Sequence, residues 1–93
     1  MSETKVLIVD DQAMVRAGFR LVLDAQADLR VVGEAEDGLA AIDAVRRLWP
    51  DVVVMDVRMP GMDGVEATAR ITAAEDAPRV LILTTFDLDE YVH

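Results

Sequence analysis

Short aliphatic runs alternate along this chain with longer segments of helical periodicity. The aliphatic runs are rich in Val, Leu, Ile and Met and are predicted as buried strands: Val6–Val9, Leu29–Ala35, Val52–Met55 and Val80–Leu83. Amphipathic helices are predicted between them: Gln12 to about Ala25–Asp28, Leu39–Leu48 and Val65 to about Ala73, with another beginning at Asp87–His93. The segment Arg58–Gly64 is predicted as a loop because it is rich in Pro and Gly.

The first two helices show their buried faces clearly. In the first helix, the apolar stripe is expected to consist of Val15, Phe19, Val22 and Leu23. The opposite, polar face is expected to carry Arg16, Arg20 and Asp24. In the second, Ile42, Val45 and Leu48 share one side, Pro50 ends the helix, and Trp49 is expected to be a partly buried anchor.

Strands that alternate with helices predict an α/β fold with a doubly wound parallel sheet and helices on both faces. In such sheets, ligands bind beyond the carboxyl ends of the strands. With 93 residues, the chain is one small domain at most.

Composition narrows the function. The formal net charge of -9 argues against binding of DNA or RNA by this segment, because that needs clustered Lys and Arg. The chain has no cysteine, which excludes disulfides and thiolate metal sites. No stretch approaches the ~20 apolar residues of a membrane span, and no signal peptide is evident, so a cytoplasmic location is expected.

Polar residues of a restricted kind follow three of the predicted strands. They are Asp10 and Asp11 after the first, Asp56 after the third, and Thr84 after the fourth. A parallel sheet brings them to one edge, where carboxylates repel one another unless a cation joins them. Without His or Cys nearby, such a site selects a hard ion such as Mg²⁺. Asp11 precedes the first helix, so capping of that helix is a further role left open.

An aspartate held beside Mg²⁺ can act as a nucleophile on a phosphoryl donor. The Thr84 hydroxyl could then donate a hydrogen bond to a phosphoryl oxygen.

Three segments resemble the motif blocks of response-regulator receiver domains: Val6–Asp11 (VLIVDD), Val52–Gly64 (VVVMDVRMPGMDG) and Val80–Thr85 (VLILTT). The resemblance implies the sheet order 2-1-3-4-5. It implies that Asp56 accepts a phosphoryl group from a phosphohistidine on a sensor histidine kinase. Mg²⁺, which Mn²⁺ can replace, would be held by Asp10, Asp11, Asp56 and the backbone carbonyl of Arg58.

The resemblance assigns further roles by position. Thr84 would be the switch hydroxyl that contacts the phosphoryl group, and Pro60 and Gly64 would shape the loop after Asp56. Thr85–Val92 is most similar to receivers of the NarL/FixJ subfamily, which control a LuxR-type helix-turn-helix domain. Through such an output domain, the whole protein would bind DNA and regulate transcription, with self-association expected.

One departure from the family concerns the end of the chain. Receivers continue through a fourth helix, then a fifth strand with a phosphate-contacting lysine, and a fifth helix. Residues 1–93 stop before that strand, so we expect a truncated receiver domain without its output domain. If the polypeptide ended there, the fourth strand would be an open edge and phosphorylation would be slow.

Three other interpretations stay open from the sequence. A phosphatase resembling haloacid dehalogenases would need a second Asp two residues after Asp56, where this chain has Arg58. A nucleotide- or flavin-binding domain would need a Gly- or Ser/Thr-rich phosphate loop where Asp10-Asp11-Gln12 stands. A receiver that acts by protein contact alone would not need the acidic residues and Thr84.

Overall fold

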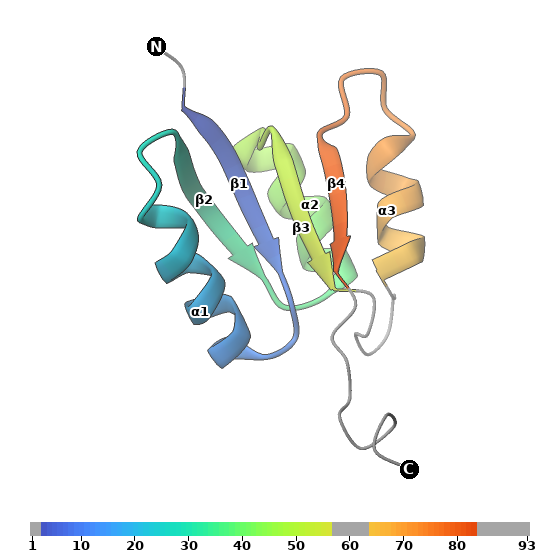
Figure 1. The fold of residues 1–93 in the computed structure, drawn as a ribbon. Helices are drawn as coiled ribbons and strands as arrows, with labels where there is room; N and C mark the ends of the chain where they lie inside the picture. The colour runs from blue at the N-terminus through green and yellow to red at the C-terminus, as the bar shows by residue number, and fades with distance from the viewer. Residues whose placement is uncertain (1–2, 57–63, 84–93) are drawn as a thin grey trace.

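The computed structural model describes residues 3–56 and 64–83, in which strands and helices alternate as predicted (Figure 1). The strands are β1 (Thr4–Val9), β2 (Leu29–Ala35), β3 (Val52–Asp56) and β4 (Arg79–Leu83). The helices are α1 (Ala13–Asp24), α2 (Gly38–Leu48) and α3 (Gly64–Thr72). The fourth helix expected from Asp87 lies outside the described residues.

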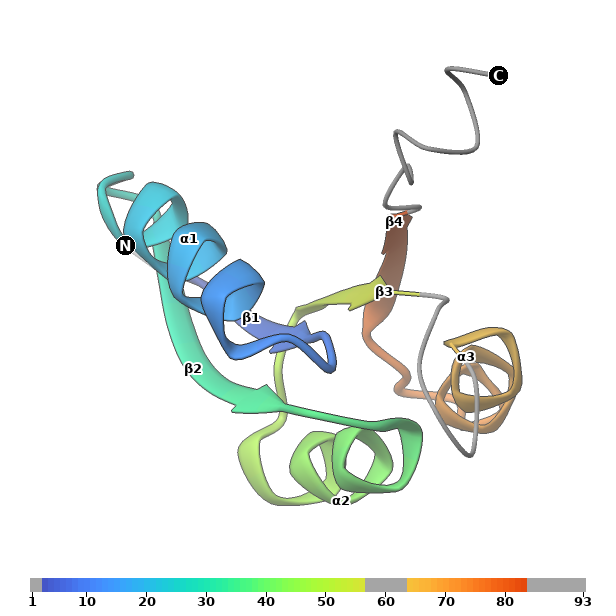
Figure 2. The ribbon, with the colours of Figure 1, turned by 90° about the horizontal axis from the view of Figure 1, so that it is seen from below.

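The four strands form one parallel sheet in the order β2-β1-β3-β4, which confirms the expected doubly wound topology. Helix α1 lies on one face of the sheet, and α2 and α3 lie on the other (Figure 2). All four strands point the same way, so their carboxyl ends meet at one edge (Figure 1). Over residues 3–56 and 64–83, no helix combines the length and the apolar character needed to span a membrane.

The main core lies between the two central strands and helices α2 and α3. Because side chains alternate across a strand, one face of β1 and β3 supplies the fully buried Leu7, Val9, Val53 and Met55. The helices meet them with the small residues Ala41, Ala44 and Ala67 and with the larger Ile71. Burying each large aliphatic side chain contributes about 1.5–3 kcal/mol, so this layer holds the strand ends in place.

The register of β1 against β3 sets up the carboxyl edge. Val6 pairs with Val52, and the pairing runs without a shift to Val9 and Met55. The next residue on each chain is an aspartate, Asp10 after β1 and Asp56 at the end of β3. Two carboxylates therefore leave neighbouring strands at the same level.

The structure answers one question about α1 that the sequence left open and contradicts one expectation. The helix begins at Ala13 with Gln12 as its N-cap, and no side chain accepts a capping hydrogen bond, so Asp11 does not cap it. Asp11 thus lies one residue before the cap position, in the loop where the Gln12 amide donates to the Asp10 carboxylate at 2.9 Å. Val22 is exposed rather than buried, because α1 contacts the sheet through a narrower stripe of half-buried residues, Val15, Phe19 and Leu23.

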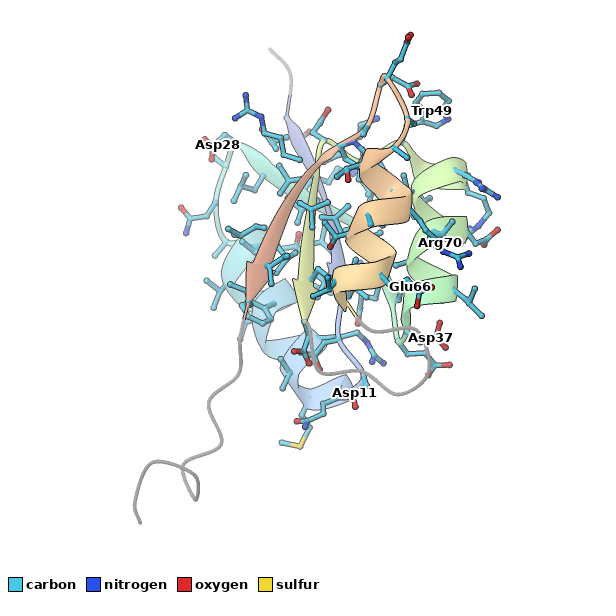
Figure 3. All side chains as sticks on the ribbon, turned by 90° about the vertical axis from the view of Figure 1, so that its right-hand side faces the viewer. Asp11, Asp28, Asp37, Trp49, Glu66 and Arg70 are labelled. Carbon is cyan, nitrogen blue, oxygen red and sulfur yellow. The ribbon has the colours of Figure 1, made fainter. Side chains whose placement is uncertain are left out.

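Trp49 is also placed differently from the prediction. It is the C-cap of α2 in the left-handed conformation, with φ 52° and ψ 54°, and its side chain is 63% exposed. It lies at the end of the sheet opposite Asp11 (Figure 3). The left-handed cap ends the helix before Pro50, and the indole lies largely in solvent instead of anchoring the helix in the core.

Candidate functional site

Three aspartates meet at the carboxyl edge of the sheet. The carboxylates of Asp10, Asp11 and Asp56 each offer an oxygen within 4.8 Å of the other two. Asp10 and Asp56 are only 3% and 4% exposed, whereas Asp11 faces solvent. Figure 3 shows Asp11 beyond the carboxyl ends of the strands. The predicted acidic cluster is therefore present in the fold.

Asp10 is held firmly by its neighbours. Its amide donates to the carbonyl of Ala35 on β2 at 3.1 Å, and one carboxylate oxygen accepts from the Gln12 amide. Burial raises the pKa of Asp10, and the neighbouring Asp56 and Asp11 carboxylates raise it further, although the Gln12 hydrogen bond acts in the opposite direction. A buried carboxylate beside two others has an electrostatic cost that a cation would remove.

The donor set fits a hard divalent cation. It consists of carboxylate oxygens that lie within 4.8 Å of one another, and two of them belong to buried side chains. Mg²⁺ prefers oxygen ligands and takes one or two carboxylates together with water and phosphate oxygens. Mn²⁺ accepts the same ligands.

Of the other predicted site residues, the structure describes only Gly64. Gly64 is buried at the start of α3, where its carbonyl accepts from the Thr68 hydroxyl at 2.6 Å. Arg58, Pro60 and Thr84 lie outside the described residues. Leu83, which precedes Thr84, pairs with Asp56 across β3 and β4.

One residue near the site was missed from the sequence. Arg16 was assigned to the polar face of the first helix, away from the sheet. Its guanidinium instead donates to the backbone carbonyl of Asp10 at 2.7 Å and to Glu34 at 3.1 Å. The available signal was its place one helical turn inside α1, from which a long side chain can reach back to the preceding loop.

Comparison with known proteins agrees with the fold and identifies the family. Residues 6–93 match the response regulator receiver domain. The chain is 48% identical over 88 residues to the uncharacterized transcriptional regulatory protein YxjL of Bacillus subtilis, covering 95% of this chain and 40% of that protein. The chain thus spans less than half the length of this curated relative.

Solved structures give the same answer. The signal receiver domain of the putative response regulator NarL from Mycobacterium tuberculosis superimposes with a TM-score of 0.86 at 37% identity, covering 94% of this chain and 70% of that one. The isolated REC domain of RcsB from Salmonella enterica serovar Typhimurium, solved in the presence of the phosphomimetic BeF3-, gives 0.83 at 30% identity, over 92% and 64%. This chain belongs to the response regulator receiver domain family.

Proposed function

We propose that Asp56 is the phosphoacceptor of this receiver domain and that Asp10 and Asp11 hold the cation that the reaction needs. The convergence of the three carboxylates within 4.8 Å at the carboxyl edge of the sheet is the observation that carries the proposal. The similar RcsB REC domain, solved in the presence of the phosphomimetic BeF3-, supports the proposal because a phosphomimetic stands in for a phosphoryl group.

The chemistry follows from the position of Asp56. A carboxylate oxygen attacks the phosphorus of a phosphohistidine, the P–N bond breaks, and the imidazole leaves and takes up a proton. The product is an acyl phosphate on Asp56. A bound Mg²⁺ or Mn²⁺ supplies charge neutralisation for the phosphoryl oxygens in this step.

The protein residues have separate tasks in this proposal. The buried end of β3 holds Asp56 in one orientation, so little is lost in aligning it with the donor. Asp10 and Asp11 approach from the neighbouring strand and provide negative charge for the cation. The Arg58 carbonyl would complete the ligands, Thr84 would donate to the phosphoryl group, and Pro60 would shape the intervening loop.

The partners follow from the family and its relatives. We assign the phosphoryl donor to a sensor histidine kinase in the cytoplasm. Because YxjL is a transcriptional regulatory protein and is longer than this chain, we assign DNA binding and self-association to the whole protein. Phosphorylation of Asp56 would then bias a two-state arrangement that the output domain senses.

The test is intact-mass spectrometry of the full-length protein incubated with acetyl phosphate, with Mg²⁺ or with EDTA. We expect one phosphoryl group on the wild type with Mg²⁺, and none with EDTA or in Asp56→Asn, which keeps the shape of the side chain but removes the nucleophile. Phosphorylation of Asp56→Asn to the wild-type level would overturn the assignment.

The same protein preparation distinguishes a receiver from the alternative, an aspartyl-phosphate phosphatase. A receiver should transfer the phosphoryl group to itself and should not turn over repeatedly on a simple ester such as p-nitrophenyl phosphate. Many turnovers per protein, lost in Asp56→Asn, would identify an aspartyl-phosphate phosphatase instead.

A further inference from the structure

Arg16 reaches from α1 to the loop that carries two of the three carboxylates. Its Nη1 donates to the Asp10 carbonyl at 2.7 Å, and its Nε donates to Glu34 on β2 at 3.1 Å. The Arg16 side chain is only 17% exposed. One guanidinium therefore joins α1, the β1–α1 loop and β2, and the rigid planar fork suits this geometry.

The carbonyl that Arg16 contacts belongs to the peptide between Asp10 and Asp11. Because a peptide group is planar, fixing its oxygen fixes the direction in which the chain leaves Asp10. The Asp10 amide is already held by Ala35 on β2. With both sides of Asp10 fixed, the exposed Asp11 next to it is also directed toward the cluster.

The positive charge of Arg16 disfavours cation binding, whereas its orientation of the ligands favours it. A guanidinium bound to the Asp10 backbone carbonyl would repel Mg²⁺ at the neighbouring cluster, although Glu34 offsets part of its charge. Glu34 also accepts from Arg20 at 2.6 Å, so Glu34 keeps a partner if Arg16 is removed. The two effects predict opposite changes in Mg²⁺ affinity when Arg16 is removed. Loss of ligand orientation would weaken binding, whereas loss of the repelling charge would strengthen it.

We propose that Arg16 is a positioning residue for the cation site, acting through the Asp10 carbonyl to orient the Asp10 and Asp11 carboxylates. The proposal rests on the proposed function, because it concerns the cation that Asp56 phosphorylation needs. Groups that orient metal ligands typically change metal affinity by about 10–100-fold when removed. This effect exceeds that of one partly neutralised charge near the surface.

The test compares Arg16→Met and Arg16→Lys with wild type in the full-length protein. The dissociation constant for Mg²⁺ is measured without phosphodonor, from the NMR shifts of the backbone amides of residues 10–12. We expect the constant to rise about tenfold in Arg16→Met, despite the loss of a repelling charge. It should also rise in Arg16→Lys, which keeps the charge but cannot bridge both acceptors.

Phosphorylation kinetics give a second measurement. With acetyl phosphate, the half-saturating Mg²⁺ concentration should rise by the same factor, while the rate at saturating Mg²⁺ should stay within about twofold of wild type. A general loss of structure would instead lower both the rate at saturating Mg²⁺ and the thermal midpoint, without a selective rise in the half-saturating Mg²⁺ concentration.

Arg20→Met is the matched control. Arg20 pairs with the same Glu34 from the same helix but has no hydrogen bond to Asp10 among the described contacts. It should leave Mg²⁺ affinity unchanged. Unchanged or tighter binding in Arg16→Met, or an equal loss in Arg20→Met, would overturn the positioning role. Failure of the proposed function would look different, because the wild type itself would then not be phosphorylated on Asp56.

Discussion

Asp10 combines burial with two like charges at close range. Burial is the largest cause of its raised pKa, followed among the raising causes by Asp56 and Asp11. A raised pKa in the folded state means that the folded protein binds a proton more readily than the unfolded chain. The stability that this group contributes is therefore present below its ordinary pKa of 3.8 and is lost as the pH rises through the folded value.

Replacement of Asp10 by Asn should stabilise the metal-free protein at neutral pH. The change removes the buried charge but keeps an oxygen for the Gln12 amide, so we expect a gain of about 0.5–2 kcal/mol. The gain over wild type should shrink as the pH falls from about 7 to below about 4, where the carboxyl is protonated in both states. Urea unfolding followed by circular dichroism in EDTA measures the difference.

Asp37→Asn provides the control for this prediction. Asp37 lies near the same edge of the sheet and caps α2 by accepting from the Ala40 amide at 2.8 Å (Figure 3). Asn caps helices about as well as Asp, so this variant should change stability by less than about 0.5 kcal/mol. An Asp10→Asn variant that is less stable than wild type, or a gain that does not vary with pH, would contradict the electrostatic explanation.

At the scale of the element, α2 ends on a residue in an unfavourable conformation. Trp49 has φ 52°, a region that costs L-residues with a Cβ roughly 1–2 kcal/mol and glycine almost nothing. Trp49→Gly should therefore be about 1 kcal/mol more stable than Trp49→Ala, since both variants lose the indole. Chemical unfolding followed by far-UV circular dichroism avoids dependence on tryptophan fluorescence.

The matched comparison lies inside the same helix. Asp43 is exposed in α2 and pairs with Arg47 at 2.8 Å, so the Ala and Gly variants lose the same ion pair. There glycine should be less stable than alanine by about 1 kcal/mol, because the conformation is helical. If the Ala variant were the more stable one at both positions, the left-handed cap would not determine the effect at Trp49.

The errors of the sequence prediction also lie at helix ends and surfaces. The aliphatic runs identified every described strand: β1 and β3 are buried on both faces, and β4 keeps the same aliphatic pattern although Leu81 and Ile82 are exposed. Periodicity alone did not show that α1 packs through so narrow a stripe, which leaves Val22 outside. The role of Arg16 depends on its hydrogen bonds to Asp10 and Glu34, and that of Asp11 on the residue at which α1 begins; hydrophobic patterns are insensitive to both.

At the scale of the molecule, topology made the acidic cluster predictable. Once the strands are parallel, every residue that follows a strand end lies at one edge, so Asp10 and Asp56 had to be neighbours if their strands paired. The register could not be derived from the sequence. Neither could the irregularity between Val6 and Leu7 against β2, because the aliphatic runs are uniform enough to permit several alignments.

The net charge of -9 on residues 1–93 gives the receiver domain a field that acts separately from the cation site. Raising KCl from about 0.01 M to about 0.15 M shortens the Debye length from about 30 Å to about 8 Å and screens this self-repulsion. It also weakens exposed ion pairs such as Arg47–Asp43 and Arg70–Glu66, but each is worth only about 0.3–0.5 kcal/mol. We therefore expect screening of the net charge to dominate.

The thermal midpoint of the receiver should accordingly rise with KCl by about 4 °C, the shift for about 1 kcal/mol in a domain of this size. The rise should be similar in wild type and Asp10→Asn, because it depends on total charge. Millimolar MgCl₂ at constant ionic strength should stabilise only the wild type, because a site-bound ion acts by mass action on the folded state. Differential scanning calorimetry in both salts separates the two effects. A midpoint that falls with KCl would mean that the ion pairs outweigh the net repulsion, and equal stabilisation of both proteins by MgCl₂ would place the cation away from Asp10.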